Sequence, residues 1–339
     1  MQDTQKPVAP LTLVTAYYQV EDPLRPDRTL RDNKDKMSKL LPFIKWPVAV
    51  FCEAELVGTI NSLRGDKPTM IYVTPREDFL VWRHREILQA HNAQRQPGFA
   101  VDLSLIYHEK ANFVRRAIID NPYQSEMFLW CDMGLMRGSK DRWTTNVLRL
   151  SERIEWPNLQ ACRAFGDQVA FFGSPNLPPP PAKTFQFWVL AAIWGGKAAP
   201  TRRFCDTYYD FLEGYIGRHS DAIRRGIAVP PGEGFRYEEA LMRRMYADPA
   251  TRQTIDMRML TDADIDWICK IKRIACIEPT APVFRTGADT GILYCLSGGH
   301  FPWGCLGREI SLLQGARLAV QLAVKLCRMK WRRIFRTAK

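Results

Sequence analysis

The chain is 339 residues long, and 46% of its residues are hydrophobic, 25% charged and 11% aromatic. These proportions are typical of a globular protein with a sizeable core, and they exclude a disordered or collagen-like chain. The formal net charge is +12. Charge alone would allow nucleic acid, an anionic membrane surface or a phosphorylated substrate as the partner.

Short apolar runs alternate with helix-compatible segments through the first 135 residues. We expect strands at 11–18, 47–52, 69–73 and 126–131, and helices at 29–41, 54–63, 77–91 and 108–119. Strands that alternate with helices in this way predict an α/β fold, in which a mainly parallel, Rossmann-like sheet is covered by helices on both faces.

Beyond residue 134 the alternation loosens. We expect strands at 168–172, 185–193 and 291–296, and helices at 201–217, 236–247 and 309–335. The proline run at 178–181 has apolar residues on both flanks, which favours a rigid loop within one domain. The sequence therefore predicts a single α/β domain over residues 1–307 and a separate tail over residues 308–339.

The positive charge is concentrated in this tail. Residues 308–339 hold nine Lys or Arg and one acid, a net +8, so the rest of the chain is near neutral at +4. Its expected helix is basic and amphipathic, a pattern typical of a helix lying in a membrane interface, or of one packed on its own domain or on a dimer partner. We expect an anionic membrane surface as the partner, and no nucleic acid, because the body shows no basic-aromatic platform.

Several targeting and catalytic signatures are missing from the sequence. The first ten residues are polar, unlike a secretory signal peptide, and no run reaches the roughly 20 apolar residues of a membrane span. Nine cysteines without a CxxC spacing suit a reducing compartment. GxGxxG after the first strand, GxxxxGK[ST] and GxSxG are also missing. We expect a protein of the cytoplasm, peripheral on the inner face of the plasma membrane.

Polar residues gather where the expected strands end, the edge at which open parallel sheets bind ligands. Asp132 follows the apolar strand at 126–131; a carboxylate there can hold a divalent cation, but Asp-x-Gly is also common turn chemistry. Lys110 shares a helix face with Phe113 and Val114. It could hold phosphate as a point charge, or its stem could lie along the core while its head reaches water.

Two neighbouring acids differ in their helical phase. Glu238 shares a face with Leu241 and Met242, so it could act as a base or an electrostatic partner, or it could be solvated at the helix start. Glu239 precedes Arg243 by four residues, which predicts a surface ion pair.

His300 lies in a glycine-flanked loop, Ser297-Gly298-Gly299-His300, just after the expected strand at 291–296. A histidine in such a loop is a candidate metal ligand. It could equally be structural or simply solvated.

Several segments match a known family in the correct order over about residues 11 to 250. They are Thr12-Leu-Val-Thr-Ala-Tyr-Tyr18, Trp46-Pro-Val-Ala-Val-Phe51, Lys110, Asn121-Pro122-Tyr123, Phe128-Leu-Trp-Cys-Asp-Met-Gly134, Gly195-Gly196 and Glu238-Glu239-Ala-Leu-Met242. With these motifs the chain resembles the HtrL/YibB family, bacterial proteins regarded as glycosyltransferases of the GT-A type and linked with surface polysaccharide.

The resemblance implies a nucleotide-sugar site at the strand edge. The donor-binding residues would be Thr15, Ala16, Tyr17, Lys110, Asp132 and Gly134, with Lys110 facing the donor phosphates. Asp132 would stand where GT-A enzymes place the metal carboxylate of their DxD motif, although glycine replaces the second Asp. With His300 it would hold Mn²⁺ or Mg²⁺.

The resemblance also implies where the acceptor lies. Glu238 and Glu239 would be near it, with Glu238 as the base if the reaction inverts configuration. The implied activity is transfer of a sugar from a nucleotide-sugar donor to a polysaccharide, glycan or lipopolysaccharide-type glycolipid acceptor. The alternative is a non-catalytic, membrane-peripheral protein that keeps the GT-A fold.

Overall fold

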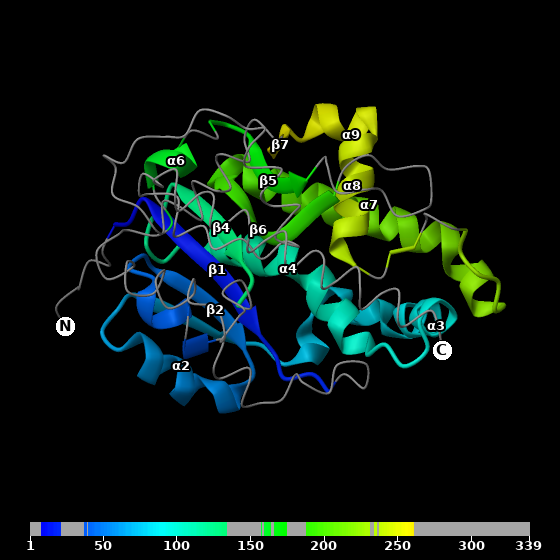
Figure 1. The fold of residues 1–339 in the computed structure, drawn as a ribbon, viewed down its shortest axis with the longest axis horizontal. Helices are drawn as coiled ribbons and strands as arrows, with labels where there is room; N and C mark the ends of the chain where they lie inside the picture. The colour runs from blue at the N-terminus through cyan, green and yellow to red at the C-terminus, as the bar shows by residue number, and fades with distance from the viewer. Residues whose placement is uncertain are drawn as a thin grey trace, which may run out of the picture.

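The computed structural model describes residues 8–21, 37–38, 40–133, 157, 159–163, 166–174, 188–230, 234–235 and 237–260. Within them, seven strands form one sheet in the order β3-β2-β1-β4-β6-β5-β7 (Figure 1). The strands are β1 (Leu11–Tyr17), β2 (Val48–Cys52), β3 (Thr69–Val73), β4 (Met127–Cys131), β5 (Val169–Ser174), β6 (Trp188–Lys197) and β7 (Met257–Leu260).

The predicted α/β fold with a mainly parallel sheet is confirmed for this part of the chain. β1 pairs in parallel with β2 and β4, β2 with β3, and β5 with β7. β6 lies between β4 and β5 and runs antiparallel to both. The order along the sheet reverses at β1, because β2 and β3 extend from one side of β1 and β4 begins the other side.

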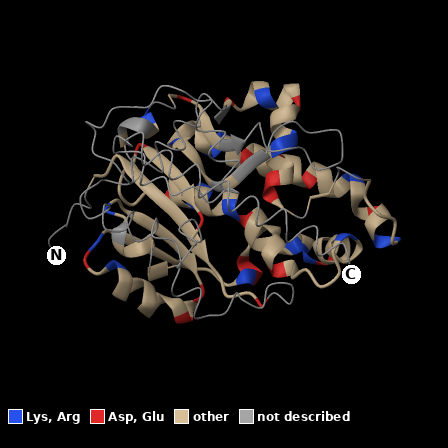
Figure 2. Cartoon of the chain, viewed as in Figure 1, with Lys and Arg blue, Asp and Glu red and all other residues tan. Residues whose placement is uncertain are grey.

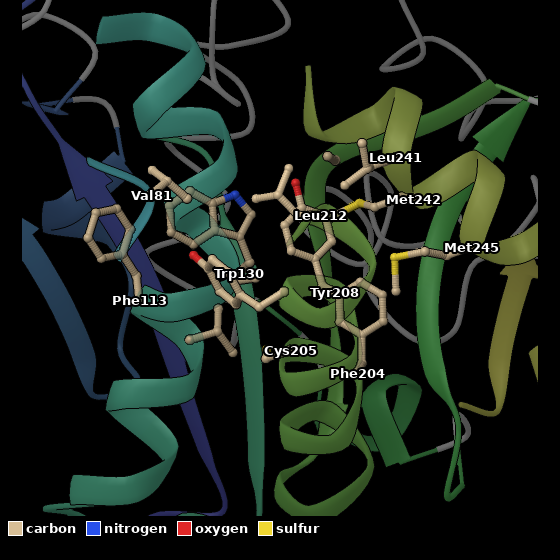
Figure 3. Packing of buried hydrophobic residues seen from close by; sticks show 14 of the residues in the cluster. Val81, Phe113, Trp130, Phe204, Cys205, Tyr208, Leu212, Leu241, Met242 and Met245 are labelled. Atoms are coloured by element: carbon tan, nitrogen blue, oxygen red, sulfur yellow. The ribbon is translucent and has the colours of Figure 1, made fainter. Parts of the chain in front are cut away.

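Both faces of the sheet are buried, as its continuous apolar strands require. On one face, Val14 and Phe128 pack with α3 (Arg85–Arg95), α4 (Val101–Asp120), α7 (Ala198–Arg224) and α8 (Glu238–Ala247). Figure 3 shows this layer, with Trp130 of β4 among side chains of α4, α7 and α8. On the other face, Leu13 and Leu129 pack with η1 (Leu41–Phe43), α2 (Val57–Arg64) and α6 (Leu159–Arg163).

Several predicted helices differ in their bounds. The helix expected at 201–217, for example, is α7, which continues to Arg224. The helix expected at 77–91 is divided into η3 (Arg76–Asp78), η4 (Leu80–His84) and α3. The helix expected from residue 108 begins at Val101 instead. The segment 101–105 alternates apolar and polar residues like a strand, yet Leu105 is fully buried in the core from a helical backbone.

Close approach of β6 to β4 depends on glycine. Gly195 has φ +144°, and a Cβ there would lie 2.1 Å from the carbonyl oxygen of Phe128, so only glycine fits. The Gly195-Gly196 pair lies inside β6, since the strand continues to Lys197. This part of the family-like sequence therefore has a packing role.

Some elements were not expected from the sequence, and some expected ones lie elsewhere. α6, α9 (Pro249–Thr254) and β7 are additional. The predicted helices at 29–41 (mostly) and 309–335, the strand at 291–296 and the tail at 308–339 lie outside the described residues. None of the described helices is long and apolar enough to cross a bilayer.

Candidate functional site

The strand order of the sheet alone indicates where a ligand site should lie. In open α/β sheets, ligands bind beyond the carboxyl ends of the strands, at the point where the strand order reverses. Here that point lies between β1 and β4. Strands β1 to β4 carry no charged residue, whereas the helices beside the sheet carry Lys, Arg, Asp and Glu (Figure 2).

Asp132 directly follows β4 at this point. Its Oδ1 accepts a hydrogen bond from the Trp130 indole Nε1 at 2.8 Å and lies 2.8 Å from the Lys110 Nζ. The side chain of Asp132 is 29% exposed. Asp132 is thus a fixed carboxylate that is still open to solvent or a ligand.

Lys110 is buried beside it. The predicted inward orientation is correct, but Lys110 lies in the middle of α4 rather than near its start. Its Nζ also donates to Oε1 of Glu238 at 2.5 Å and lies 5.2 Å and 5.4 Å from the ring centroids of Tyr107 and Trp130. Burial alone would lower the pKa of Lys110, but the charges of Asp132 and Glu238 outweigh it and raise that pKa. The ammonium is therefore charged.

Glu238 is the third member of this charged cluster of Asp132, Lys110 and Glu238. It is the first residue of α8 and is 3% exposed, which excludes the solvated alternative. Burial raises its pKa to about 7, against the lowering effect of Lys110, and the charges of Asp132 and Glu239 add to the rise. A carboxyl group with a pKa near neutrality can take up or release a proton at physiological pH.

Glu239 has a role besides the ion pair with Arg243 that the sequence predicts. Its Oε1 accepts a hydrogen bond from the backbone N–H of Ala191 at 3.2 Å, and the residue is half-buried. Burial raises its pKa, while the Ala191 bond and the charges of Lys110 and Arg243 oppose the rise. Glu239 thereby fixes α8 against β6, directly next to Glu238 of the charged cluster.

Glu109 is a buried carboxylate with a structural role. It accepts hydrogen bonds from the backbone N–H groups of Leu80 and Val81 and from Asn112 Nδ2, at 3.0, 3.2 and 2.6 Å. Burial raises its pKa to about 7. Its hydrogen bonds hold η4 on α4, so its raised pKa does not mark a second site.

The predicted donor-binding residues of β1 do not all face the charged cluster. Tyr17 packs in the core on the opposite sheet face, with Leu13, and strand alternation puts Thr15 on that face too. Ala16 packs on the face of α4. Gly134 and His300 lie outside the described residues.

A second polar group lies at the same sheet edge, beyond β1, β2 and β3. Arg76 pairs with Glu53 at 2.8 Å and with Asp102 at 2.7 Å, and it donates to the carbonyl oxygen of Gln19. All three side chains of these ion pairs are partly exposed. The group links the ends of the three strands to the first turn of α4.

The described residues do not by themselves make a metal site. Both donors to Asp132 Oδ1 are protein groups, and no three His, Cys, Asp or Glu side chains in the described part of the chain converge on one point. The predicted Mn²⁺ or Mg²⁺ would need ligands such as His300 from outside this part. It stays a prediction.

Sequence reasoning missed two aromatic residues of the site. Trp130 has the same strand face as Asp132, because the two are separated by two positions, and this spacing was a usable signal. Tyr107 precedes Lys110 by three residues on α4, so the two share a helix face. Both rings face the ammonium group.

Comparison with known proteins adds little to this geometry. No protein-family model matches the chain, and neither does any curated protein. Among solved structures, the chain is similar to the crystal structure of mouse xyloside xylosyltransferase 1 in its apo form, with 10% identity and a TM-score of 0.36. The alignment covers 70% of this chain and 82% of that one. A likeness this weak identifies no family, so membership in the HtrL/YibB family stays a prediction.

Proposed function

We propose that the protein is a glycosyltransferase that uses a nucleotide-sugar donor. The observation that carries the proposal is the charged cluster of Asp132, Lys110 and Glu238 at the point where the strand order reverses. Its position is where α/β sheets bind nucleotides. The resemblance of the sequence to the HtrL/YibB family supplies the reaction class.

The three side chains suit different parts of this reaction. Asp132 is the most exposed of them and would contact the donor. Lys110 would hold positive charge close to the leaving diphosphate, where charge develops as the sugar departs. Glu238, with its pKa near neutrality, would accept the proton of the acceptor hydroxyl if the reaction inverts configuration. Glu239 would position Glu238 through its bond to β6.

The donor can be tested by calorimetric titration with a panel of UDP-, GDP- and CMP-sugars. We expect one class to bind the wild type and to bind Asp132→Asn much more weakly. Asp167→Asn is the matched control, because Asp167 is an exposed carboxylate paired with Lys197. If no nucleotide sugar binds the wild type, the proposal fails.

A non-catalytic protein that keeps this fold is the second candidate. It is favoured by the sequence, in which glycine takes the place of the second carboxylate of a DxD motif. Release of free nucleoside diphosphate from the bound donor distinguishes the two candidates. Turnover that Asp132→Asn abolishes excludes the non-catalytic reading, and binding without turnover supports it.

We further propose that the acceptor is a glycan or glycolipid and that the basic tail at 308–339 holds the protein on an anionic membrane, on its cytoplasmic face. The proposal rests on the tail's charge and its amphipathic pattern. Removal of residues 315–339 should release the protein from liposomes containing anionic lipid without unfolding the domain. Unchanged binding of the shortened chain would refute this.

A further inference from the structure

We propose that the Lys110 ammonium is the resident cation of Asp132, so that this carboxylate takes no divalent metal ion. The other oxygen of Asp132, to which no described residue donates a hydrogen bond, then accepts one from a hydroxyl group of the ligand. The identity of that ligand as a sugar rests on the proposed function. The role of Lys110 as the cation does not.

The ammonium group of Lys110 lies between two carboxylates. Lys110 Nζ lies 2.8 Å from Oδ1 of Asp132 and 2.5 Å from Oε1 of Glu238, so two carboxylates converge on it. Divalent metal ions bind carboxylate oxygens at about 2.0–2.6 Å. A metal ion shared by the same two oxygens would have to take the place of Nζ.

The surrounding side chains hold Lys110 in this position. Its side chain is 5% exposed and projects from the middle of a 20-residue helix. The rings of Tyr107 and Trp130 lie 5.2 and 5.4 Å from Nζ, and such rings attract a cation. The ammonium therefore has little room to swing away and admit a metal ion.

The two carboxylate oxygens of Asp132 differ in their contacts. Oδ1 already accepts from Trp130 and from Lys110. Among the described residues, no hydrogen bond reaches Oδ2, although the side chain is 29% exposed. One oxygen is thus committed to the protein, and the other is available to a hydroxyl group of a bound molecule.

The sequence agrees with this assignment. Residue 134 is glycine, so the sequence has no second acid after Asp132 at the spacing of a DxD motif. A lysine fixed between two acids supplies a permanent positive charge, which does not depend on the metal concentration of the surroundings.

The test uses Mn²⁺ alone, with free Mn²⁺ measured by electron paramagnetic resonance. Wild type is compared with Asp132→Asn, and every titration is repeated with inorganic pyrophosphate, which can supply metal ligands that the protein lacks. We expect the two proteins to bind equal amounts of Mn²⁺ under both conditions. Mn²⁺ binding by wild type that Asp132→Asn removes would overturn the proposal.

A designed gain of function tests the same geometry. Lys110→Met leaves two carboxylates facing the vacated position, so we expect it to bind Mn²⁺ at least about tenfold more tightly than wild type, an effect comparable to other changes around metal ligands. Lys110→Met combined with Glu238→Gln should lose this gain. Lys197→Met is the matched control, because it frees the single exposed carboxylate of Asp167 and should gain nothing.

Each outcome decides the proposal. A folded Lys110→Met that binds Mn²⁺ no better than wild type would overturn it, since its carboxylates would not converge on one cation position. If Lys110→Met does not fold without metal, the comparison of wild type with Asp132→Asn decides alone. Failure to bind any nucleotide sugar would remove the transferase function but leave the Mn²⁺ result standing, so the two failures are distinguishable.

Discussion

Replacement of Lys110 by methionine should destabilise the protein strongly and in a pH-dependent way. Methionine keeps about the length of the apolar stem of lysine but removes the ammonium group that faces Asp132 and Glu238. Removing one partner of a buried ion pair typically costs about 3–5 kcal/mol. Because Asp132 is 29% exposed and partly shielded by water, we expect a loss of about 3 kcal/mol in the free energy of unfolding at neutral pH.

The sign of the pH dependence follows from Glu238. Its pKa in the folded wild type is raised to about 7 from the usual 4.5, so folding takes up a proton and stability falls as pH rises between these values. Loss of Lys110 raises this pKa further, because Lys110 lowers it in wild type. The fall should therefore continue above pH 7 in Lys110→Met, with a slope of at most about 1.4 kcal/mol per pH unit.

The assay is urea denaturation in the presence of EDTA, at about pH 5.5 and about pH 8.5, on either side of the Glu238 transition. Lys110→Met combined with Glu238→Gln should recover at least about 1.5 kcal/mol of the loss, a typical lower value for coupling between close charges. Lys197→Met, which breaks the exposed pair with Asp167, should leave the midpoint unchanged. A loss that is equal at both pH values, or additive effects in the double variant, would refute the reasoning.

Three further predictions concern the fold around the site. Gly195→Ala should lower the free energy of unfolding by more than about 2 kcal/mol, because its Cβ would meet the Phe128 carbonyl. Gly217→Ala, in open space on α7, should be neutral or stabilising. Equal thermal midpoints for the two variants would contradict this. Arg64→Met should lower the free energy of unfolding by about 3 kcal/mol or more in urea denaturation, because the guanidinium donates to four backbone carbonyls. Wild-type stability in Arg64→Lys would contradict the need for the planar guanidinium group. Burial lowers the pKa of His108 to about 4 from the usual 6.5. As the pH falls from 6.5 towards 4, the stability of wild type should therefore decrease more steeply than that of His108→Gln. Parallel pH profiles would show that His108 contributes nothing to the pH dependence of stability.

Much of the first half of the fold could be predicted from the sequence, because its strands are short apolar runs separated by helical segments. The orientation of β6 could not be predicted, because antiparallel pairing with β4 depends on contacts such as Trp130 with Trp194, more than 60 positions apart. The start of α4 could not be predicted, because residues 101–105 alternate like a strand. Tertiary packing of Leu105 overrides that local pattern.

The candidate site was predictable in its parts and not in its assembly. Helical phase is a local property, and it correctly placed Lys110 and Glu238 on inward faces. Their pairing joins residues 128 positions apart, and no local pattern contains that information. Strand alternation alone places Thr15 and Tyr17 on the face opposite Ala16, so the sequence contains this distinction.

The structure of a complex with a nucleoside diphosphate, determined by crystallography, tests the central claim most directly. We predict that the nucleotide lies beyond the carboxyl ends of β1 and β4, in contact with the charged cluster. A nucleotide bound elsewhere on the protein, with the charged cluster unchanged and out of contact, would contradict the assignment of this edge as the donor site.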